Sequence, residues 1–155
     1  MEIVRYEPDM AGQVAKHHYV VTRDVPHCYP VSEEETVAAL FPAAGGQSDA
    51  RLRDETAFVA RSGSSVLGFA HVALEPSGNP FAADNGIIRF LSYAPGERKT
   101  GQALVDAAER HLRERTIRAL LAFPSRYRFP VYHFANAYLS DHLDHVQALL
   151  AFNGY

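Results

Sequence analysis

The sequence predicts a single α/β domain built around a mixed β-sheet, and two observations predict it. The first is a pair of apolar runs, residues 58–61 and 66–74, on either side of a short glycine-containing turn. Such a pattern indicates an antiparallel β-hairpin. The second is a later pair of apolar runs, residues 86–93 and 117–123, with an amphipathic helix between them. A helix between two strands is typical of a parallel pair, so we expect the sheet to contain both strand directions.

Length and composition are those of an ordinary globular domain. The chain has 155 residues, of which 47% are hydrophobic and 21% charged. This is enough to bury a full core. Its net charge of −3 gives no general attraction to nucleic acid or to anionic membranes, so we expect neither as a partner. Cys28 is the only cysteine, which excludes an intramolecular disulfide and fits a reducing compartment. Residues 1–6 lack the apolar segment of a signal peptide, and no apolar run approaches the roughly 20 residues that span a bilayer, so we expect a cytoplasmic protein.

The first part of the chain predicts a strand followed by two helices. Residues 3–6 favour a short strand, and a helix follows Asp9. A second helix should begin at Ser32, because Ser32 and Glu35 have the spacing of a capping box. Residues 43–54 are small, polar and glycine-bearing, so we expect a loop there.

Two further helices have clear apolar stripes. The helix that follows Gly101 carries its stripe at Leu104, Ala107, Ala108, His111 and Leu112. The last helix should begin at Ser140 and end near Gly154. Its inward residues are expected to be Leu143, Val146, Leu149 and Leu150.

The segment from Tyr93 to Ala103 is the most informative for function. A strand leads into it, a glycine-bearing turn follows, and a helix starts. Backbone N–H groups and the positive end of a helix dipole then point at one place, which favours an anion such as a phosphate. The simpler interpretation is a tight connection in which Gly101 serves only the turn. A nucleotide-binding loop is not favoured, because no Gly-Lys-[Ser/Thr] ending and no G-x-G-x-x-G pattern is present.

The element order and the motif Arg98-x-x-Gly101-x-Ala103 together resemble the GNAT superfamily of acyl-CoA-dependent N-acyltransferases. The family signature is Arg or Gln, two residues, Gly, one residue, then Gly or Ala. The Tyr93-Ala94-Pro95 exit from the strand and Gly68 in the hairpin also match family habits. The resemblance covers residues 56–155 and extends more weakly to Ile3.

The resemblance implies a three-layer α/β/α fold with a mixed sheet and an N-acetyltransferase activity. Acetyl-CoA would be the co-substrate, and a small-molecule or peptide amine would attack its thioester directly. Small residues at Gly101 and Ala103 would let the pyrophosphate approach the backbone. The end of the strand before the turn would bind the pantetheine arm. The residues implied for coenzyme binding are Leu91, Tyr93, Arg98, Lys99, Thr100, Gly101, Gln102 and Ala103.

The sequence also departs from the family pattern. The tyrosine that usually acts as general acid would fall at Leu150, which has no proton to donate. Ser92, Tyr132 and Tyr138 are the remaining catalytic candidates. No metal site is expected, because His142 and His145 on the last helix lack a third ligand.

The chain ends at Tyr155, where family members continue into one or two more strands. The sequence therefore suggests a domain that is incomplete at its C-terminus, either as a truncated chain or as the N-terminal half of a tandem protein. The alternative function is then a non-catalytic CoA-binding or scaffolding half-domain. Its partner would be a second GNAT domain or a second copy of the chain.

Overall fold

The computed structural model describes residues 1–26, 28–40, 51–79, 81–124, 126–127, 129, 132 and 139–155. Their centre is one five-stranded sheet with the strand order β1-β2-β3-β4-β5. β1 (Glu2–Arg5), β2 (Arg53–Ser62), β3 (Ser65–Glu75) and β4 (Asn85–Tyr93) pair antiparallel, and β5 (Ala119–Ala122) lies parallel to β4. The predicted mixed sheet is confirmed.

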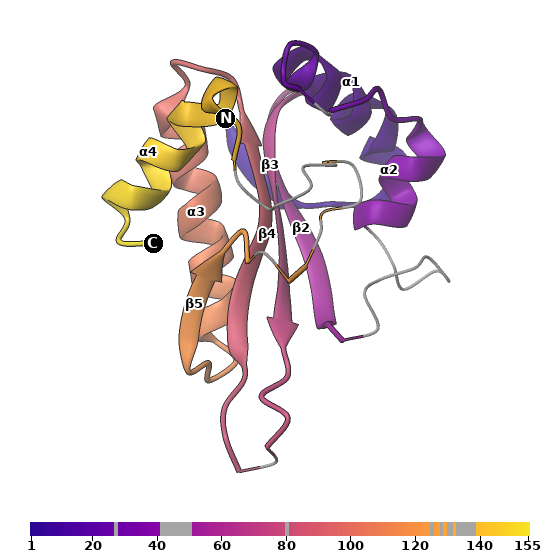
Figure 1. Cartoon of the computed structure of the whole chain (residues 1–155). Helices are drawn as coiled ribbons and strands as arrows, with labels where there is room; N and C mark the ends of the chain where they lie inside the picture. Colours follow the sequence, from indigo (N-terminus) through magenta and orange to yellow (C-terminus); the bar gives the residue numbers. More distant parts are fainter. Residues whose placement is uncertain are drawn as a thin grey trace.

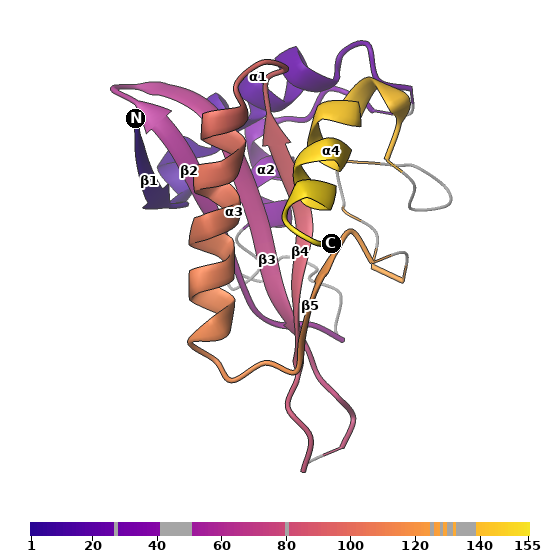
Figure 2. The ribbon, with the colours of Figure 1, turned by 90° about the vertical axis from the view of Figure 1, so that its left-hand side faces the viewer.

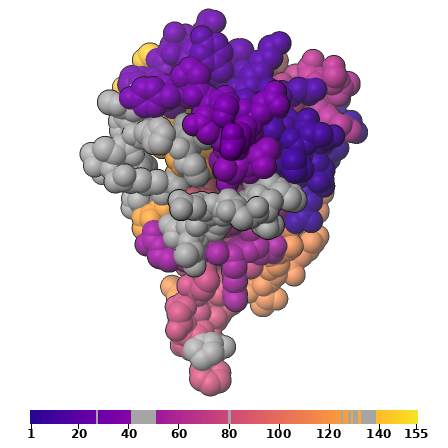
Figure 3. Space-filling view, turned by 90° about the vertical axis from the view of Figure 1, so that its right-hand side faces the viewer, coloured from indigo at the N-terminus to yellow at the C-terminus, as the bar shows by residue number. Residues whose placement is uncertain are grey.

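Helices cover both faces of this sheet, which makes three layers (Figure 1). α1 (Ala11–Thr22) and α2 (Glu33–Leu40) lie on one face, and α3 (Arg98–Arg113) and α4 (Asp144–Phe152) lie on the other. Figure 2 shows α3 running along the sheet, with α4 beside the upper part of β4. Figure 3 shows the opposite side of the molecule, with α1 and α2 over its upper part. The predicted three-layer α/β architecture is therefore confirmed.

Local sequence signals account for several element boundaries. Ser32 Oγ accepts the N–H of Glu35 at 3.1 Å, and Glu35 Oε2 accepts the N–H of Ser32 at 2.8 Å, so the predicted capping box starts α2. Ser62 pairs with Ser65 across a two-residue turn. Gly63 in this turn has a φ of +56°, a conformation that suits glycine. The predicted hairpin is confirmed.

β2 begins earlier than the sequence predicts. A loop is expected over residues 43–54, yet Arg53 and Asp54 already belong to the strand, while residues 43–50 lie outside the described part of the chain. The start of β2 is polar, but Glu55 is buried there because Arg89 of β4 donates to its carboxylate at 2.6 Å. The partner lies 34 residues further along the chain, so hydrophobicity alone cannot indicate this strand.

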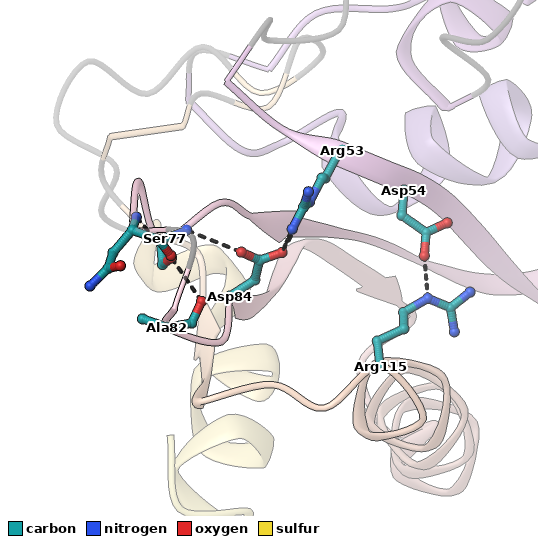
Figure 4. A network of polar contacts seen from close by, with 7 residues as sticks. Arg53, Asp54, Ser77, Ala82, Asp84 and Arg115 are labelled. Carbon is teal, nitrogen blue, oxygen red and sulfur yellow. Dashed lines mark hydrogen bonds and ion pairs between the residues drawn. The ribbon is translucent and has the colours of Figure 1, made fainter.

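Charged pairs fasten the lower end of the sheet, where the β3–β4 connection projects (Figure 4). Arg53 forms an ion pair with Asp84, and Asp84 Oδ1 accepts the N–H of Ser77 at 3.1 Å. Arg115, just after α3, pairs with Asp54. These contacts hold the β2 start, the projecting connection and the end of α3 together.

β5 pairs with only the first half of β4. Pairing runs from Asn85 opposite Ala119 to Ile88 opposite Ala122, and a last bond joins Phe123 N–H to Ile88 O at 2.8 Å. β5 is therefore shorter than the predicted strand over residues 117–123. Beyond this point β4 pairs only with β3 within the described residues. We call residues 90–93 the open edge of β4.

Candidate active site

A tight turn connects the open edge to α3. Glu97 N–H donates to Ala94 O at 3.0 Å, and Gly96 has a φ of +86°, which a glycine adopts without strain. Glu97 O then accepts the N–H groups of Thr100 and Gly101 at 2.9 and 3.2 Å. The helix therefore starts at Arg98. The sequence predicts a start only after Gly101, three residues later.

The start of α3 presents free hydrogen-bond donors. The N–H groups of Arg98 and Lys99 make no hydrogen bond within the described part of the chain. The first N–H groups of a helix have no intrahelical acceptor, and they lie at the positive end of the helix dipole. Both side chains are exposed and cationic. These donors and charges suit an anion, and the anion site at the first turn of α3 stays a prediction.

An open groove of about 620 Å³ lies beside this first turn. The Arg98 guanidinium stands 4.3 Å from the ring centre of Phe152, the last residue of α4. Phe152 is 71% exposed and is not among the site residues predicted from the sequence. The sequence indicates Phe152 only by its position: it ends the last helix and does not belong to the apolar stripe that includes Leu149 and Leu150. The groove is lined by Gly96, Glu97, Arg98, Lys99, Gln102 and Phe152.

The other residues of the predicted motif face elsewhere. A Cβ added at Gly101 would lie 2.6 Å from the ring of Tyr93 and 2.7 Å from Leu149. Gly101 is therefore small because α3 packs closely on Tyr93 and α4, which differs from the expected reason of room for a phosphate. Thr100 is buried, with its hydroxyl 3.4 Å from the Met1 sulfur. Ala103 lines a separate groove between β1 and α3.

The open edge contains both strand residues that the resemblance implies for coenzyme binding. Tyr93 O accepts from His145 Nε2–H at 2.8 Å, and Tyr93 OH donates to His145 O at 2.7 Å. Burial raises the pKa of Tyr93 to about 12, so this hydroxyl stays protonated. Backbone groups two residues apart on a strand point to the same side, so those of Leu91 also point to the open edge. Because the Tyr93 carbonyl already has a partner, Leu91 is the better placed of the two for a ligand.

The side chain of Ser92 lies on the α1 face of β4, opposite to the face of Tyr93, and contacts a histidine of α1. Ser92 Oγ lies 3.2 Å from His17 Nε2, and both residues are buried. Burial lowers the pKa of His17 to about 4, and the neighbouring His18 acts in the same direction. The imidazole is therefore uncharged at neutral pH. The two residues are 75 positions apart, so nothing in the sequence pairs them.

This burial predicts acid sensitivity. In the unfolded chain a histidine has a pKa near 6.5, whereas folded His17 has a pKa of about 4. Between these two pH values His17 is protonated in the unfolded state and neutral in the folded state. Stability should fall as the pH drops through this window, by about 2 kcal/mol from His17 at pH 5. Urea unfolding at pH 7 and pH 5 measures the loss, which should be smaller in His17→Gln. An equal loss in both proteins would contradict this assignment.

The remaining catalytic candidates are less available. Tyr132 OH accepts the N–H of Ser140 at 3.0 Å, and burial raises the pKa of this tyrosine. Tyr138 lies outside the described residues. Leu150 is buried in the core, 6% exposed. None of these described side chains offers a free proton donor at the open edge.

A buried charged cluster lies on the same face as Ser92. Glu55 Oε2 accepts from Arg89 at 2.6 Å and lies 3.4 Å from His71 Nε2, and all three side chains are almost fully buried. Glu55 Oε1 has no hydrogen-bond partner among the residues that the structure describes. Burial, followed by the charge of Arg89, lowers the pKa of His71 well below its usual value, so His71 is neutral beside the ion pair.

Metal ions and reactive thiols would need two further kinds of site. Within the described part of the chain, no three His, Cys, Asp or Glu side chains gather closely enough to hold a metal ion. Burial raises the pKa of Cys28 to about 11, which makes its thiol a poor nucleophile.

Among the described residues, no helix has the length and apolar character needed to cross a bilayer.

Several solved structures share this architecture. The whole chain aligns with 85% of a protein of Arthrobacter sp. FB24 named as an acetyltransferase, at 17% identity and a TM-score of 0.66. It aligns over 99% of its length with 87% of an aminoglycoside acetyltransferase from an uncultured soil metagenomic sample, at 12% identity and a TM-score of 0.63. A tandem GNAT protein from the clavulanic acid biosynthesis pathway matches 78% of the chain at 23% identity and a TM-score of 0.60, and the match spans 35% of that protein.

The sequence comparisons are negative. No protein-family model matches the chain, and none of the curated proteins matches it. The structural likenesses, all below 25% identity, concern the path of the backbone. On that ground, the chain has the fold of the GNAT acetyltransferases.

Proposed function

We propose that the protein transfers an acetyl group from acetyl-CoA to the amine of a small molecule or peptide. One observation carries this proposal: the free N–H groups of Arg98 and Lys99 lie at the end of a strand whose edge is open. A phosphate needs donors of this kind. A linear arm with amide groups needs an unpaired strand edge beside them. The GNAT-like fold supports the same function.

The parts of acetyl-CoA have distinct partners in this proposal. The pyrophosphate would accept the N–H groups of Arg98 and Lys99, and both side chains add positive charge. The nucleotide end would lie in the groove beside Phe152. The pantetheine arm would follow the open edge, with the backbone of Leu91 binding it and polarising the thioester carbonyl.

The chemistry proposed is direct attack without an acyl-enzyme. A neutral amine would form the new C–N bond while the C–S bond breaks and the thiolate leaves. The protein would contribute mainly by holding the two reactants in line and by excluding competing water.

A second candidate function is a coenzyme-binding half-domain that does not catalyse transfer. It is favoured by the hydroxyl groups of Tyr93, Tyr132 and Tyr155, which all make hydrogen bonds within the protein. The usual tyrosine position is also taken by the buried Leu150. This candidate predicts that acetyl-CoA binds and that no amine is acetylated.

Lys99→Glu is expected to weaken acetyl-CoA binding about tenfold at low salt. A charge near a helix N-terminus is worth up to about 1 kcal/mol, and the substitution replaces attraction to the phosphates by repulsion. Isothermal titration calorimetry measures the dissociation constant. Lys16→Glu is the matched control, because Lys16 is an exposed lysine on α1 and the net charge changes equally.

S-acetylpantetheine, which lacks the pyrophosphate, tests whether Lys99 affects binding through the pyrophosphate. Its affinity should be the same for wild type and Lys99→Glu. No heat with millimolar acetyl-CoA would exclude both candidate functions. Equal weakening by Lys16→Glu would show that only the overall charge matters and that the phosphate site lies elsewhere.

A further inference from the structure

The pair formed by Ser92 and His17 lies directly across β4 from the backbone that the thioester would contact. Ser92 stands between Leu91 and Tyr93 in the strand, and its side chain points to the α1 face. β5 has already left β4 at this level, so within the described residues no strand pairs with this side of β4 at Ser92. Ser92 therefore places its hydroxyl on the α1 side of the strand, within the open edge.

The surroundings hold this pair in place and leave it little exposed. His17 is 9% exposed and Ser92 is 2% exposed. The His17 ring meets the ring of Phe69 edge-on, with 6.3 Å between the centres. A hydroxyl held by a histidine at 3.2 Å has the distance of a proton-transfer pair.

We propose that Ser92 and His17 form a proton relay for the acceptor amine in the acetyl transfer proposed above, on which this inference rests. The amine N–H donates to Ser92 Oγ, and the Ser92 hydroxyl donates to His17 Nε2. This assigns the Nδ1–H tautomer to His17.

The step balances as follows. The amine lone pair forms the C–N bond, and the electron pair of the C–S bond leaves on sulfur as thiolate. The proton that the nitrogen loses passes to Ser92 Oγ, and the proton of Ser92 passes to His17 Nε2. The imidazolium then releases its proton to solvent, from which the thiolate takes one.

The uncharged state of His17 suits this role. A neutral ring has a lone pair free to accept, and it does not repel a cationic acceptor as it arrives. Because burial disfavours the imidazolium, His17 passes the proton on instead of storing it. His17 is therefore placed as a relay on the acceptor side, whereas α3 and α4 lie on the coenzyme side.

Five variants of the full chain test the relay. Thiol release from acetyl-CoA is followed with ethanolamine, putrescine, tyramine and glycinamide as acceptors, and calorimetry gives the affinity for acetyl-CoA. Ser92→Ala and His17→Leu are expected to lower kcat about 100-fold, within the range of general acid–base catalysis. The dissociation constant of acetyl-CoA should change less than about twofold. Thr22→Val removes a buried hydroxyl of α1 that bonds to His18 O, and it should leave kcat unchanged.

Two conservative variants separate the relay from a structural role. Ser92→Thr keeps the hydroxyl and should retain most of kcat. His17→Gln keeps a hydrogen-bonding group near Ser92 but accepts no proton, so kcat should remain low. These variants also keep the polar contact, which guards against loss through misfolding.

The outcomes are distinct. If wild type releases thiol and either Ser92→Ala or His17→Leu keeps more than a third of kcat, the relay is overturned and the proposed transfer stands. A fully active His17→Gln also overturns the relay, because orientation alone would then suffice. If wild type binds no acetyl-CoA, or acetylates none of the four amines, the transfer and the relay fall together.

Discussion

Arg89→Met is expected to lower the free energy of unfolding by about 3–5 kcal/mol. The substitution leaves the Glu55 carboxylate inside the sheet without the guanidinium that donates to it at 2.6 Å. His71 cannot replace this charge, because burial lowers its pKa well below the usual value. Urea unfolding at pH 7 measures the loss, which is large because a buried charge without its partner keeps the full desolvation penalty.

Two controls isolate the burial of this pair. Arg53→Met on β2 breaks an ion pair with Asp84 in which the arginine side chain is 61% exposed, and it should cost less than about 1 kcal/mol. The double variant Glu55→Met with Arg89→Met removes both charges and should recover most of the lost stability. A loss in Arg89→Met no greater than in Arg53→Met would mean that water reaches the carboxylate.

Gly101→Ala is expected to destabilise the protein by about 1–3 kcal/mol, although alanine is the better helix former by about 1 kcal/mol. The added methyl group would lie 2.6 Å from the Tyr93 ring and 2.7 Å from Leu149. Overpacking against a ring and a core side chain outweighs the gain in helix propensity. The effect should spread to α4, because Tyr93 holds His145 through two hydrogen bonds.

Gly12→Ala is the matched control in another helix. A Cβ at Gly12 of α1 would meet only the end of the Glu33 side chain, which can turn away. Thermal unfolding should therefore show a neutral or raised melting temperature for Gly12→Ala and a lower one for Gly101→Ala. A gain in both variants would show that Tyr93 and Leu149 move aside at little cost. Lost coenzyme affinity in a Gly101 variant would not identify a phosphate site, because the packing changes as well.

The sequence predicts the elements that depend on local patterns. The capping box at Ser32 and the hairpin turn at Gly63 are short-range signals, and both are present. The apolar stripe of the last helix has a helical period, and Leu143, Val146, Leu149 and Leu150 are buried as predicted. α4 itself begins at Asp144, later than the predicted start at Ser140, because a short 3-10 helix over Asp141–Leu143 precedes it. The element order then suffices to predict the mixed three-layer sheet.

What the sequence misses depends on residues far apart in the chain. The start of β2 is polar, and the Glu55 side chain is buried there only because Arg89 pairs with it. The start of α3 carries no side-chain cap, and Gly101 misleads because its small size serves the contact with Tyr93. His17 and Phe152 join the candidate site through α1 and α4, which no spacing within a motif can reveal.

The open edge of β4 also bears on how copies of the protein could associate. An unpaired strand edge normally attracts other protein strands and promotes aggregation. Here α4 stands beside the edge, and His145 already occupies the carbonyl of Tyr93, so a row of hydrogen bonds to another protein strand would be interrupted at this residue. The contact that fastens α4 to the sheet therefore also protects the edge against strand-by-strand association.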